Sequence, residues 1–366
     1  MNDEYYMRKA LNLARRGLGK TSPNPMVGAL IVRDGEIIGQ GYHRRYGGDH
    51  AEINAIRDAK GDMSGATLYV TLEPCCHQGK KTPPCLDALL KYNLKRVVIG
   101  TVDPNPQVNG KSIEVLRERG IETKVGVLSE ECYRLNEVYF KYIQTGIPFV
   151  TLKFAQTLDG RIASTTGDSR WISSEPSLKL AHKLRSFHDA VLVGVGTILS
   201  DDPQLTVRQV KGRNPIRIVT DSRLRIPLNS KILTDQEIAP TLIATTSQAD
   251  RGKSSSLMQM GIETLMVEED KEGKVDLKDL LKKLGQREFS SILVEGGATL
   301  ITSLIQQELV DRFVVILAPK IMGKGIDTVG DLGISDVERA LKLSLDKAYR
   351  SGEDLVIEAR PEVDRR

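Results

Sequence analysis

The hydrophobic and polar positions of the first 146 residues alternate between helical and strand spacing. Apolar residues at helical intervals over 4–17, followed by a glycine suited to a helix end, predict an amphipathic helix. Apolar runs at 27–32 and 36–42 flank Asp34-Gly35, a strong signal for a β-hairpin. The pattern further predicts helices at 51–59, 85–92 and 112–119 and strands at 67–72, 96–101 and 123–127. This alternation is typical of a layered α/β domain.

A second series of elements begins after Gly146. Its apolar runs predict strands at 149–155, 190–193, 216–220, 241–245, 291–294, 312–317 and 354–359. Helices are predicted at 176–187, with Leu180 and Leu184 on one face, and after Gly296-Gly297. The charged residues 271–274 are interpreted as a solvated turn. We therefore predict two α/β domains, residues 1–146 and 147–366.

The composition of the 366 residues, 40% hydrophobic and 27% charged, is typical of a globular protein. The chain has no apolar run of membrane-spanning length and no visible secretory signal, so we expect a cytoplasmic protein. A net charge of +4 suits anionic small molecules and is too small to indicate a nucleic-acid partner. Three of the four cysteines lie between 75 and 85, which favours metal binding over disulfides.

One histidine and two cysteines that follow prolines have the character of zinc ligands. His50, Cys75 and Cys85 supply three ligands, and a catalytic zinc keeps a fourth position for water. Glu52, two residues after His50, is the candidate carrier of a proton from that water to the leaving ammonia. We expect each cysteine at a helix start, where the helix dipole favours a thiolate. The pattern is that of a zinc-dependent nucleobase deaminase.

The residues leave some alternatives open. Positions 50 and 52 point in different directions on a regular helix, so the His-x-Glu pair requires an irregular helix start. Cys76 competes with Cys75, which we prefer because it directly follows Glu73-Pro74. A structural zinc site or ordinary buried cysteines are the simpler alternatives. Cys132, on a helical stretch, is interpreted as a packing residue.

Motifs along the whole chain resemble the bifunctional riboflavin-biosynthesis family RibD/RibG. The deaminase half of the family is matched by TSPNPMVG at 21–28, HAE at 50–52, EPC at 73–75, TPPC at 82–85 and DPNP at 103–106. Its reductase half is matched by KFA at 153–155, LDG at 158–160, SRWIS at 169–173, DDP at 201–203 and VEGG at 294–297. The resemblance implies an α/β fold: a cytidine-deaminase-like three-layer α/β/α domain, then a dihydrofolate-reductase-like α/β domain.

The family implies two consecutive reactions. Zinc-dependent hydrolysis deaminates the ring of 2,5-diamino-6-ribosylamino-4(3H)-pyrimidinone 5′-phosphate. NADPH-dependent reduction of the ribosyl group then gives 5-amino-6-(5-phosphoribitylamino)uracil. The resemblance thus implies one Zn²⁺ per deaminase domain, NADPH, a small phosphorylated pyrimidine as substrate, neither nucleic acid nor membrane as partner, and a homo-oligomer, either a dimer or a tetramer.

The resemblance also assigns substrate contacts in the deaminase half. Asn24 and His43 would contact the substrate, with His77 and a lysine nearer its phosphate. That lysine is Lys80 or Lys81, because the loop before Cys85 is one residue longer than in the family. From the residues alone, Asn24 is equally typical of a turn between two prolines, and His43 of a histidine on the surface.

In the reductase half, a strand is followed by Glu295, two glycines and a helix, whose first N–H groups suit a dinucleotide phosphate. The resemblance places the cofactor along Ala155, Trp171, Thr197, Asp201, Ser222, Gly297, Ala298 and Thr299. It places the substrate against Ser169, Arg185, Leu205, Arg208 and Glu295.

The chemistry of these residues is consistent with such roles. Arg185 and Arg208 suit a phosphate because a guanidinium offers paired N–H groups. Lys153 is a candidate to stabilise the opened sugar or imine, with an exposed strand lysine as the alternative. Asp201 would orient the nicotinamide or pass a proton, with Asp202 as the competing residue. Trp171 would form a wall against the nicotinamide, although a lone tryptophan is commonly core packing.

Two other functions are weighed against the bifunctional enzyme. A nucleic-acid deaminase would show a more basic face and a Pro-Cys-x-x-Cys spacing, whereas position 78 is Gln78. A zinc-stabilised binding module that senses a nucleotide would not require Glu52. The sequence therefore favours the enzyme.

Overall fold

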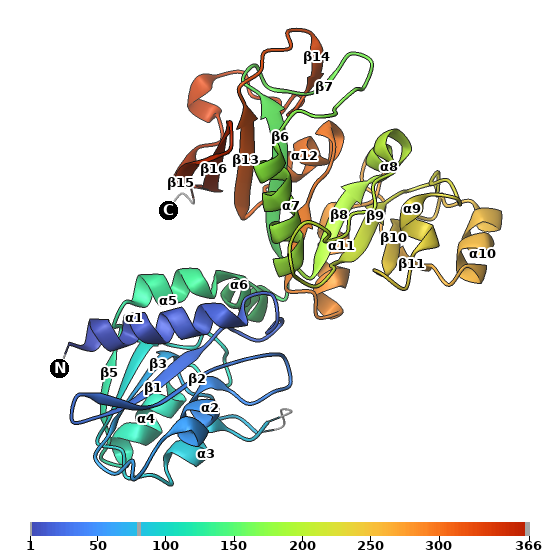
Figure 1. Ribbon diagram of the computed structural model, residues 1–366. Coiled ribbons are helices and arrows are strands. Elements are labelled where there is room, and N and C mark those ends of the chain that lie inside the picture. The colour runs from blue at the N-terminus through green and yellow to red at the C-terminus, as the bar shows by residue number, and fades with distance from the viewer. Residues whose placement is uncertain (1, 79–81, 363–366) are drawn as a thin grey trace. The chain divides into compact units, whose positions relative to one another are not determined.

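The computed structural model describes residues 2–78 and 82–362 of the chain (Figure 1). Its contacts divide the chain into two compact units, Met1–Gly146 (unit 1) and Ile147–Arg366 (unit 2). Within the described residues, no helix is long and apolar enough to cross a membrane.

The described part of unit 1 contains a five-stranded sheet in the order β2-β1-β3-β4-β5. Its strands are β1 (Gly28–Arg33), β2 (Glu36–Tyr42), β3 (Thr67–Leu72), β4 (Arg96–Thr101) and β5 (Glu122–Val125). Strand β1 is antiparallel to β2 and β3, whereas β3, β4 and β5 are parallel. Every residue of β3 is buried, as expected of a central strand with helices on both faces.

Helices cover both faces of this sheet (Figure 1). They are α1 (Asp3–Ala14), α2 (Ala51–Asp58), α3 (Cys85–Leu89), α4 (Lys111–Glu118), α5 (Ser129–Leu135) and α6 (Glu137–Thr145). The apolar sides of α2, α3 and α4 pack on one face. Helix α1 packs on the other face, where Cys132 of α5 is also buried, so this cysteine is a packing residue as predicted.

Glycines of β2 let helix α2 lie directly on the sheet. A Cβ atom on Gly41 would come within 2.3 Å of the Ala51 carbonyl oxygen, and one on Gly39 within 2.5 Å of the Ala55 carbonyl oxygen. Any side chain at these positions would push the helix away. The N-terminus of α2, which carries His50, is therefore set against the sheet by these two glycines.

Unit 2 contains, among its described residues, a nine-stranded sheet in the order β11-β10-β9-β8-β12-β6-β13-β16-β15. Its strands are β6 (Phe149–Thr157), β8 (Ala190–Gly194), β9 (Ile216–Thr220), β10 (Thr241–Thr245), β11 (Glu263–Met266), β12 (Ser291–Val294), β13 (Arg312–Ala318), β15 (Leu343–Ser351) and β16 (Asp354–Pro361). The strands from β11 to β13 in this order are parallel, and β16 and β15 add an antiparallel edge. A separate pair joins β7 (Arg161–Ser164) to β14 (Gly325–Asp327).

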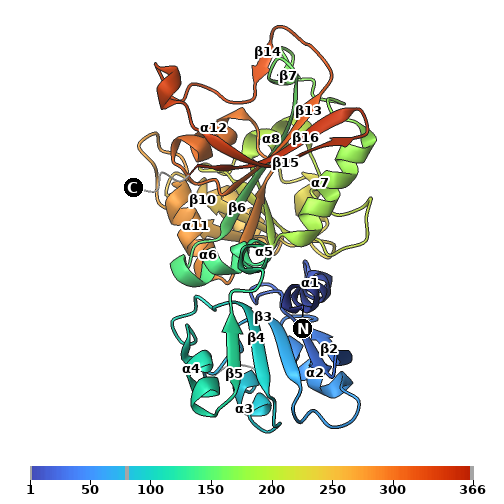
Figure 2. The ribbon, with the colours of Figure 1, turned by 90° about the vertical axis from the view of Figure 1, so that its left-hand side faces the viewer.

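Helices again cover both faces. They are α7 (Glu175–Phe187), α8 (Val195–Asp201), α9 (Lys231–Thr234), α10 (Arg251–Gln259), α11 (Leu277–Gln286) and α12 (Ala298–Gln306). Helices α11 and α12 pack on one face and α8, α9 and α10 on the other. Leu180 and Leu184 of α7 pack against Val314 and Ile316, which confirms the predicted apolar face of this helix, and Figure 2 shows α7 across the sheet from α11 and α12.

The predicted elements are largely confirmed, with a few differences. The helix predicted at 85–92 ends at Leu89. Strand β15 was missed because most of its residues are exposed and carry no alternating apolar pattern. Helix α11 was not predicted, although its buried leucines recur at helical spacing.

A buried carboxylate ties α1 to the sheet of unit 1. Asp3 accepts hydrogen bonds from Tyr69 (3.0 Å), Arg96 (2.9 and 3.2 Å) and Lys124 (2.7 Å). Burial acts to raise the pKa of Asp3, but the hydrogen bonds from Arg96, Lys124 and Tyr69 outweigh it and lower the pKa to about 2. The ionised carboxylate thus stabilises the folded unit.

We expect Asp3→Asn to destabilise unit 1 by about 2 kcal/mol at pH 7, because each unit of pKa shift corresponds to about 1.4 kcal/mol. The stabilisation is complete above the pKa of an unfolded aspartate, about 3.9, and is lost as the pH falls toward the folded value of about 2. Hydrogen exchange at the amides of β3 measures the difference, which should be smaller at pH 3 than at pH 7. The exposed neighbour variant Glu4→Gln is the control, and an equal effect of both variants would contradict the prediction.

Candidate active sites

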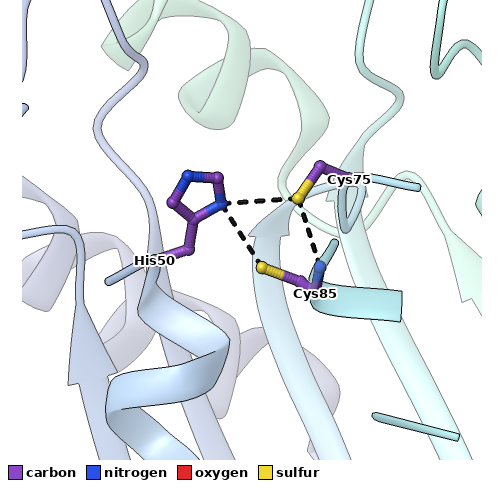
Figure 3. Close-up of side chains that lie close together, drawn as sticks. All are labelled: His50, Cys75 and Cys85. Atoms are coloured by element: carbon purple, nitrogen blue, oxygen red, sulfur yellow. Dashed lines mark hydrogen bonds between the residues drawn. The ribbon is translucent and has the colours of Figure 1, made fainter. Parts of the chain in front are cut away.

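Three side chains from separate elements of unit 1 meet at one point (Figure 3). His50 is the residue just before helix α2, Cys85 is the first residue of α3, and Cys75 lies in the loop after β3. Cys85 therefore stands at a helix start as expected. The same expectation for Cys75 was wrong, because β3 leads into an irregular loop there.

The ligand atoms of this cluster point toward one another. His50 Nδ1 lies 3.4 Å from Cys75 Sγ and 3.3 Å from Cys85 Sγ, and the three ligand atoms lie within 4.8 Å of each other. The Cys85 backbone N–H donates to Cys75 Sγ at 3.3 Å. One nitrogen and two sulfurs in this arrangement suit zinc, and three protein ligands leave a position for a reacting molecule.

Cys76 lies outside this cluster. Its half-buried thiol is directed to the Gln107 carbonyl oxygen at 3.8 Å. The cluster thus contains Cys75, the cysteine preferred from sequence.

Glu52 stands in the first turn of α2, where its side chain is only 3% exposed. His50 has an extended backbone, with φ −73° and ψ 168°, so the His-x-Glu pair spans the irregular helix start that the chemistry requires. Burial, and next the charge of Cys75, raise the pKa of Glu52, whose carboxyl also hydrogen-bonds Cys85. The carboxyl group therefore lies beside the ligand cluster and is suited to take up and release a proton.

Asn24 and His43 form a second polar pair beside the cluster. The His43 ring is 2% exposed and lies 5.2 Å from the His50 ring. Since its Nδ1 faces the Asp49 carbonyl oxygen at 3.0 Å, Nδ1 carries the proton and Nε2 accepts from the Asn24 amide at 3.2 Å. Burial lowers the pKa of His43. The alternative of a surface histidine is therefore wrong.

The remaining deaminase residues are less closely defined. His77 is half-buried in the loop after Cys75. Lys80 and Lys81 lie outside the described residues, so the choice between them stays a prediction.

A buried glutamate organises the Cys75 loop. The Glu73 carboxylate accepts backbone N–H groups of Asp103 (3.2 Å), Gly110 (2.9 Å) and Ser112 (3.1 Å). The Ser112 hydroxyl donates to the Pro74 carbonyl oxygen at 2.5 Å. The sequence contained the Glu-Pro-Cys motif but carried no signal that the glutamate holds the loop after β4.

Two of the substrate residues predicted in unit 2, Arg185 and Glu295, form an ion pair. Arg185, near the end of α7, donates from Nε and Nη2 to both oxygens of Glu295 at 2.6 and 2.9 Å, and from Nη1 to the Thr206 carbonyl oxygen at 3.1 Å. Burial acts to raise the pKa of Glu295, but Arg185, and then Lys153, lower it. The paired N–H groups of Arg185, which were expected to bind a phosphate, thus donate to the Glu295 carboxylate.

Lys153 of β6 lies next to this ion pair. Burial lowers its pKa, an effect that Glu295 opposes and Arg185 reinforces. The lysine is half-buried at the centre of the sheet, so the alternative of an ordinary exposed strand lysine is wrong.

Arg208, unlike Arg185, is an exposed residue. Its Nη1 donates to the Thr206 hydroxyl at 2.7 Å, and its backbone N–H donates to His182 Nδ1 at 3.2 Å. Leu205 is buried, with φ +54°, and Ser169 is half-buried in the loop before α7. His182, which sequence reasoning missed, gave no signal beyond an ordinary helix position.

A cavity of about 370 Å³ opens at the carboxyl ends of β8 and β9 and the N-terminus of α12. Five residues predicted for the cofactor line it: Thr197, Ser222, Gly297, Ala298 and Thr299. The chain leaves β8 toward β9 and returns to β12 on the other side, which is the switch point where open parallel sheets bind ligands.

Three predicted cofactor residues lie outside the lining of this cavity, as far as the described residues define it. Ala155 packs beside Leu180 on the α7 face. Trp171 is 67% exposed, so core packing, its alternative, is wrong. Asp201 is the last residue of α8. The competing residue, Asp202, already accepts the Lys231 backbone N–H through Oδ1 at 2.9 Å.

The cavity has three charged lining residues that sequence reasoning did not assign: Arg225, Asp270 and Lys274. Arg225 follows β9, at the end where ligands of parallel sheets bind. Lys274 belongs to the turn interpreted as solvated, and that interpretation is incomplete because the residue also lines the cavity.

Comparisons with known proteins cover both units. The RibD C-terminal domain family matches residues 148–357, and the cytidine and deoxycytidylate deaminase zinc-binding region matches residues 1–101. The riboflavin biosynthesis protein RibD of Aquifex aeolicus (strain VF5) is 48% identical over 356 residues, 97% of each chain. That of Escherichia coli (strain K12) is 43% identical over 336 residues, 88% of this chain and 89% of the relative.

Solved structures agree with these matches. Acinetobacter baumannii RibD, form 1, superposes with a TM-score of 0.88 at 35% identity and 99% coverage of both chains. A diaminohydroxyphosphoribosylaminopyrimidine deaminase/5-amino-6-(5-phosphoribosylamino)uracil reductase from Thermotoga maritima gives 0.86 at 39% identity and 98% coverage of both chains. The fold class expected from the sequence is confirmed.

We expect Cys75→Ser and Cys85→Ser each to weaken zinc binding by more than about 100-fold, since loss of outer-shell partners alone costs 10- to 100-fold. Cys76→Ser is the matched control and should keep about one zinc ion per chain. Mass spectrometry of the metal content after dialysis measures both. Zinc loss in Cys76→Ser with retention in Cys75→Ser would reverse the ligand assignment.

Proposed function

This chain belongs to the RibD family, and from that premise we propose that its two units catalyse consecutive steps of riboflavin biosynthesis. Residues 1–146 form the deaminase domain and residues 147–366 the NADPH-dependent reductase domain. The observation that carries the proposal is the convergence of His50, Cys75 and Cys85 beside the buried carboxyl of Glu52. A structural metal site does not require such a carboxyl.

The deaminase step replaces the ring amino group of the diaminopyrimidinone ribosylamine phosphate by oxygen from water and releases ammonia. His50, Cys75 and Cys85 would hold the zinc ion, which would supply the Lewis-acid chemistry that lowers the pKa of water. Glu52 takes a proton from the attacking water and delivers it to the ring and to the departing amine. Asn24 and His43 orient the ring, because the hydrogen bond between them fixes both side chains.

The reductase step converts the ribosyl group to a ribityl chain. When bound, NADPH would supply the hydride for C1′ of the opened sugar, and a proton would complete the reduction. Lys153 holds the group that accepts the hydride, and Glu295 keeps Arg185 and Lys153 in place. Arg208, an exposed residue, binds the substrate phosphate. Asp201 and Trp171 would lie beside the nicotinamide.

The enzyme is further proposed to work in the cytoplasm as a homo-oligomer, either a dimer or a tetramer. The free cysteines of the described chain fit a reducing compartment. Exposed Leu343, Leu345 and Tyr349 on the edge strand β15 supply apolar surface for association. Light scattering of the purified protein measures its mass, and a monomer at working concentration would contradict the oligomer.

A paired assay of the wild type and of two variants, one in each unit, tests the proposed function. Ammonia release and NADPH oxidation are followed on the zinc-loaded enzyme with the diaminopyrimidinone ribosylamine phosphate. The wild type should release ammonia without NADPH and oxidise NADPH only after deamination. Glu52→Gln should keep its zinc but lose ammonia release by about 100- to 10,000-fold.

Lys153→Gln should lose the NADPH signal alone, whereas Glu52→Gln, which makes no deaminated product, should lose both signals. The lysine variant should lose NADPH oxidation by about 100-fold because it removes a charge beside the reacting group, yet release ammonia at the wild-type rate. Lys153→Gln, which keeps ammonia release, is the control for Glu52→Gln. Unchanged deamination in Glu52→Gln would exclude this proton carrier, and a wild type with neither signal would reject the pathway.

A further inference from the structure

The cationic side of the unit 2 cavity has no role in the function proposed so far. Arg225 and Lys274 line this cavity together with Gly297, Ala298 and Thr299 at the N-terminus of α12. The two cations come from segments far apart in the sequence, the loop after β9 and the turn before α11. Their convergence therefore exists only in the folded protein.

The two segments are held together by a specific contact. The Ser222 hydroxyl, which also lines the cavity, accepts the Val275 backbone N–H at 3.0 Å. This hydrogen bond fixes the loop of Arg225 beside the turn of Lys274. The cations are thus positioned by neighbouring backbone and are not independent surface side chains.

A buried carboxylate positions Arg225. Asp221 is fully buried, and its Oδ2 accepts the Ile226 backbone N–H at 2.8 Å. Its Oδ1 has no hydrogen-bond partner among the described residues and faces Arg225 Nε at 3.7 Å. Arg225 is the counter-ion on this side, while its side chain remains 62% exposed and available to a ligand.

Another part of the cavity lining, the N-terminus of α12, suits a different phosphate. The residue before helix α12, Gly297, makes no side-chain cap, so the first N–H groups of this helix are available to an anion. In a dinucleotide the adenosine ribose is bonded directly to the pyrophosphate, so a pyrophosphate held there would bring this ribose toward the rest of the cavity lining. A phosphate on that ribose needs its own cations.

We propose that Arg225 and Lys274 bind the 2′-phosphate of the NADPH adenosine and thereby select NADPH over NADH. This inference rests on the reductase function proposed above. A guanidinium offers paired N–H donors and a lysine a point charge, a combination suited to a phosphate dianion. NADH lacks this phosphate and gains nothing from either residue.

Acidic neighbours do not block this role. The Asp270 carboxylate is engaged in its own turn, where Oδ1 accepts the backbone N–H groups of Glu272 and Lys274 at 2.8 Å each. Glu272 pairs with Lys274 at 2.5 Å, but both side chains are at least half exposed. Such a pair contributes little, so Lys274 exchanges it for a phosphate at small cost.

Direct binding tests the inference without turnover. Calorimetric titration of the zinc-loaded enzyme with NADPH and with NADH should show tighter NADPH binding. Arg225→Gln and Lys274→Gln should each weaken NADPH binding by about 10- to 100-fold, the range expected for a lost charged hydrogen bond, and leave NADH binding within about twofold. The two variants should also weaken binding of adenosine 2′,5′-bisphosphate, as for NADPH. They should leave binding of adenosine 5′-monophosphate nearly unchanged, as for NADH.

Matched controls come from the same two segments. Arg223→Gln removes an arginine that donates to Gln248 Oε1 at 3.0 Å, and Lys271→Gln removes an exposed lysine of the same turn; neither residue is in the cavity lining. Both should bind NADPH as the wild type does. Because Arg225→Gln leaves Asp221 without its counter-ion, Arg225→Lys is a second variant, which keeps the charge and should lose only part of the affinity.

The outcomes separate this inference from the proposed function. Equal losses for NADPH and NADH, or equal effects of the control variants, would overturn the phosphate assignment while the reductase stands. A wild type that binds neither dinucleotide would reject the reductase and this inference together. Selective loss of NADPH and of the 2′,5′-bisphosphate supports the assignment.

Discussion

A buried glutamate at the carboxyl end of a central strand organises each unit. Glu73 follows β3 and Glu295 follows β12, and each still donates its backbone N–H to the neighbouring strand, to Thr101 and Leu192 respectively. Beyond that hydrogen bond the strand pairing ends, and contacts of the glutamate side chain hold the following segment. Glu73 accepts hydrogen bonds from three backbone N–H groups of the segment after β4, whereas Glu295 accepts them from the Arg185 guanidinium. Because a buried carboxylate without partners is costly, these contacts are obligatory and hold the loops that carry the chemistry.

Both sites therefore lie at the carboxyl end of a central strand, yet they suit different chemical groups. In unit 1, helix N-termini bring a histidine and a cysteine to a second cysteine, and the donor set selects a soft metal ion. Two glycines of β2 contribute indirectly, because they let α2 approach the sheet and so place His50. In unit 2, the reversal of strand order between β8 and β12 opens a cavity whose walls offer backbone N–H groups and cations. One unit thus binds through side-chain ligands and the other through the shape and charge of a crevice.

The strength of the sequence pattern varied with burial. Strands β3, β4, β9, β10 and β12 were predicted within one residue because their apolar side chains stand out from polar loops. Strand β15 has no such contrast, since it lies at an exposed edge of the sheet. The metal ligands were predictable for another reason: histidine and cysteine are rare in this chain, and their chemistry is specific. The expected helix start at Cys75 failed because Glu73, and not a helix, orders that loop.

The sequence by itself determined the metal-binding chemistry, the carboxylate beside it and the presence of two α/β units, because these depend on residue type and local spacing. Only the tertiary structure decided how the charged residues are paired. Arg185 pairs with Glu295, 110 positions away, and His43 is buried against Asn24, which excludes the surface position that remained an alternative from sequence. Arg225 and Lys274 share one cavity across two separate segments. Such pairings arise from long-range packing of the sheet, which places distant residues together without any periodicity in the chain.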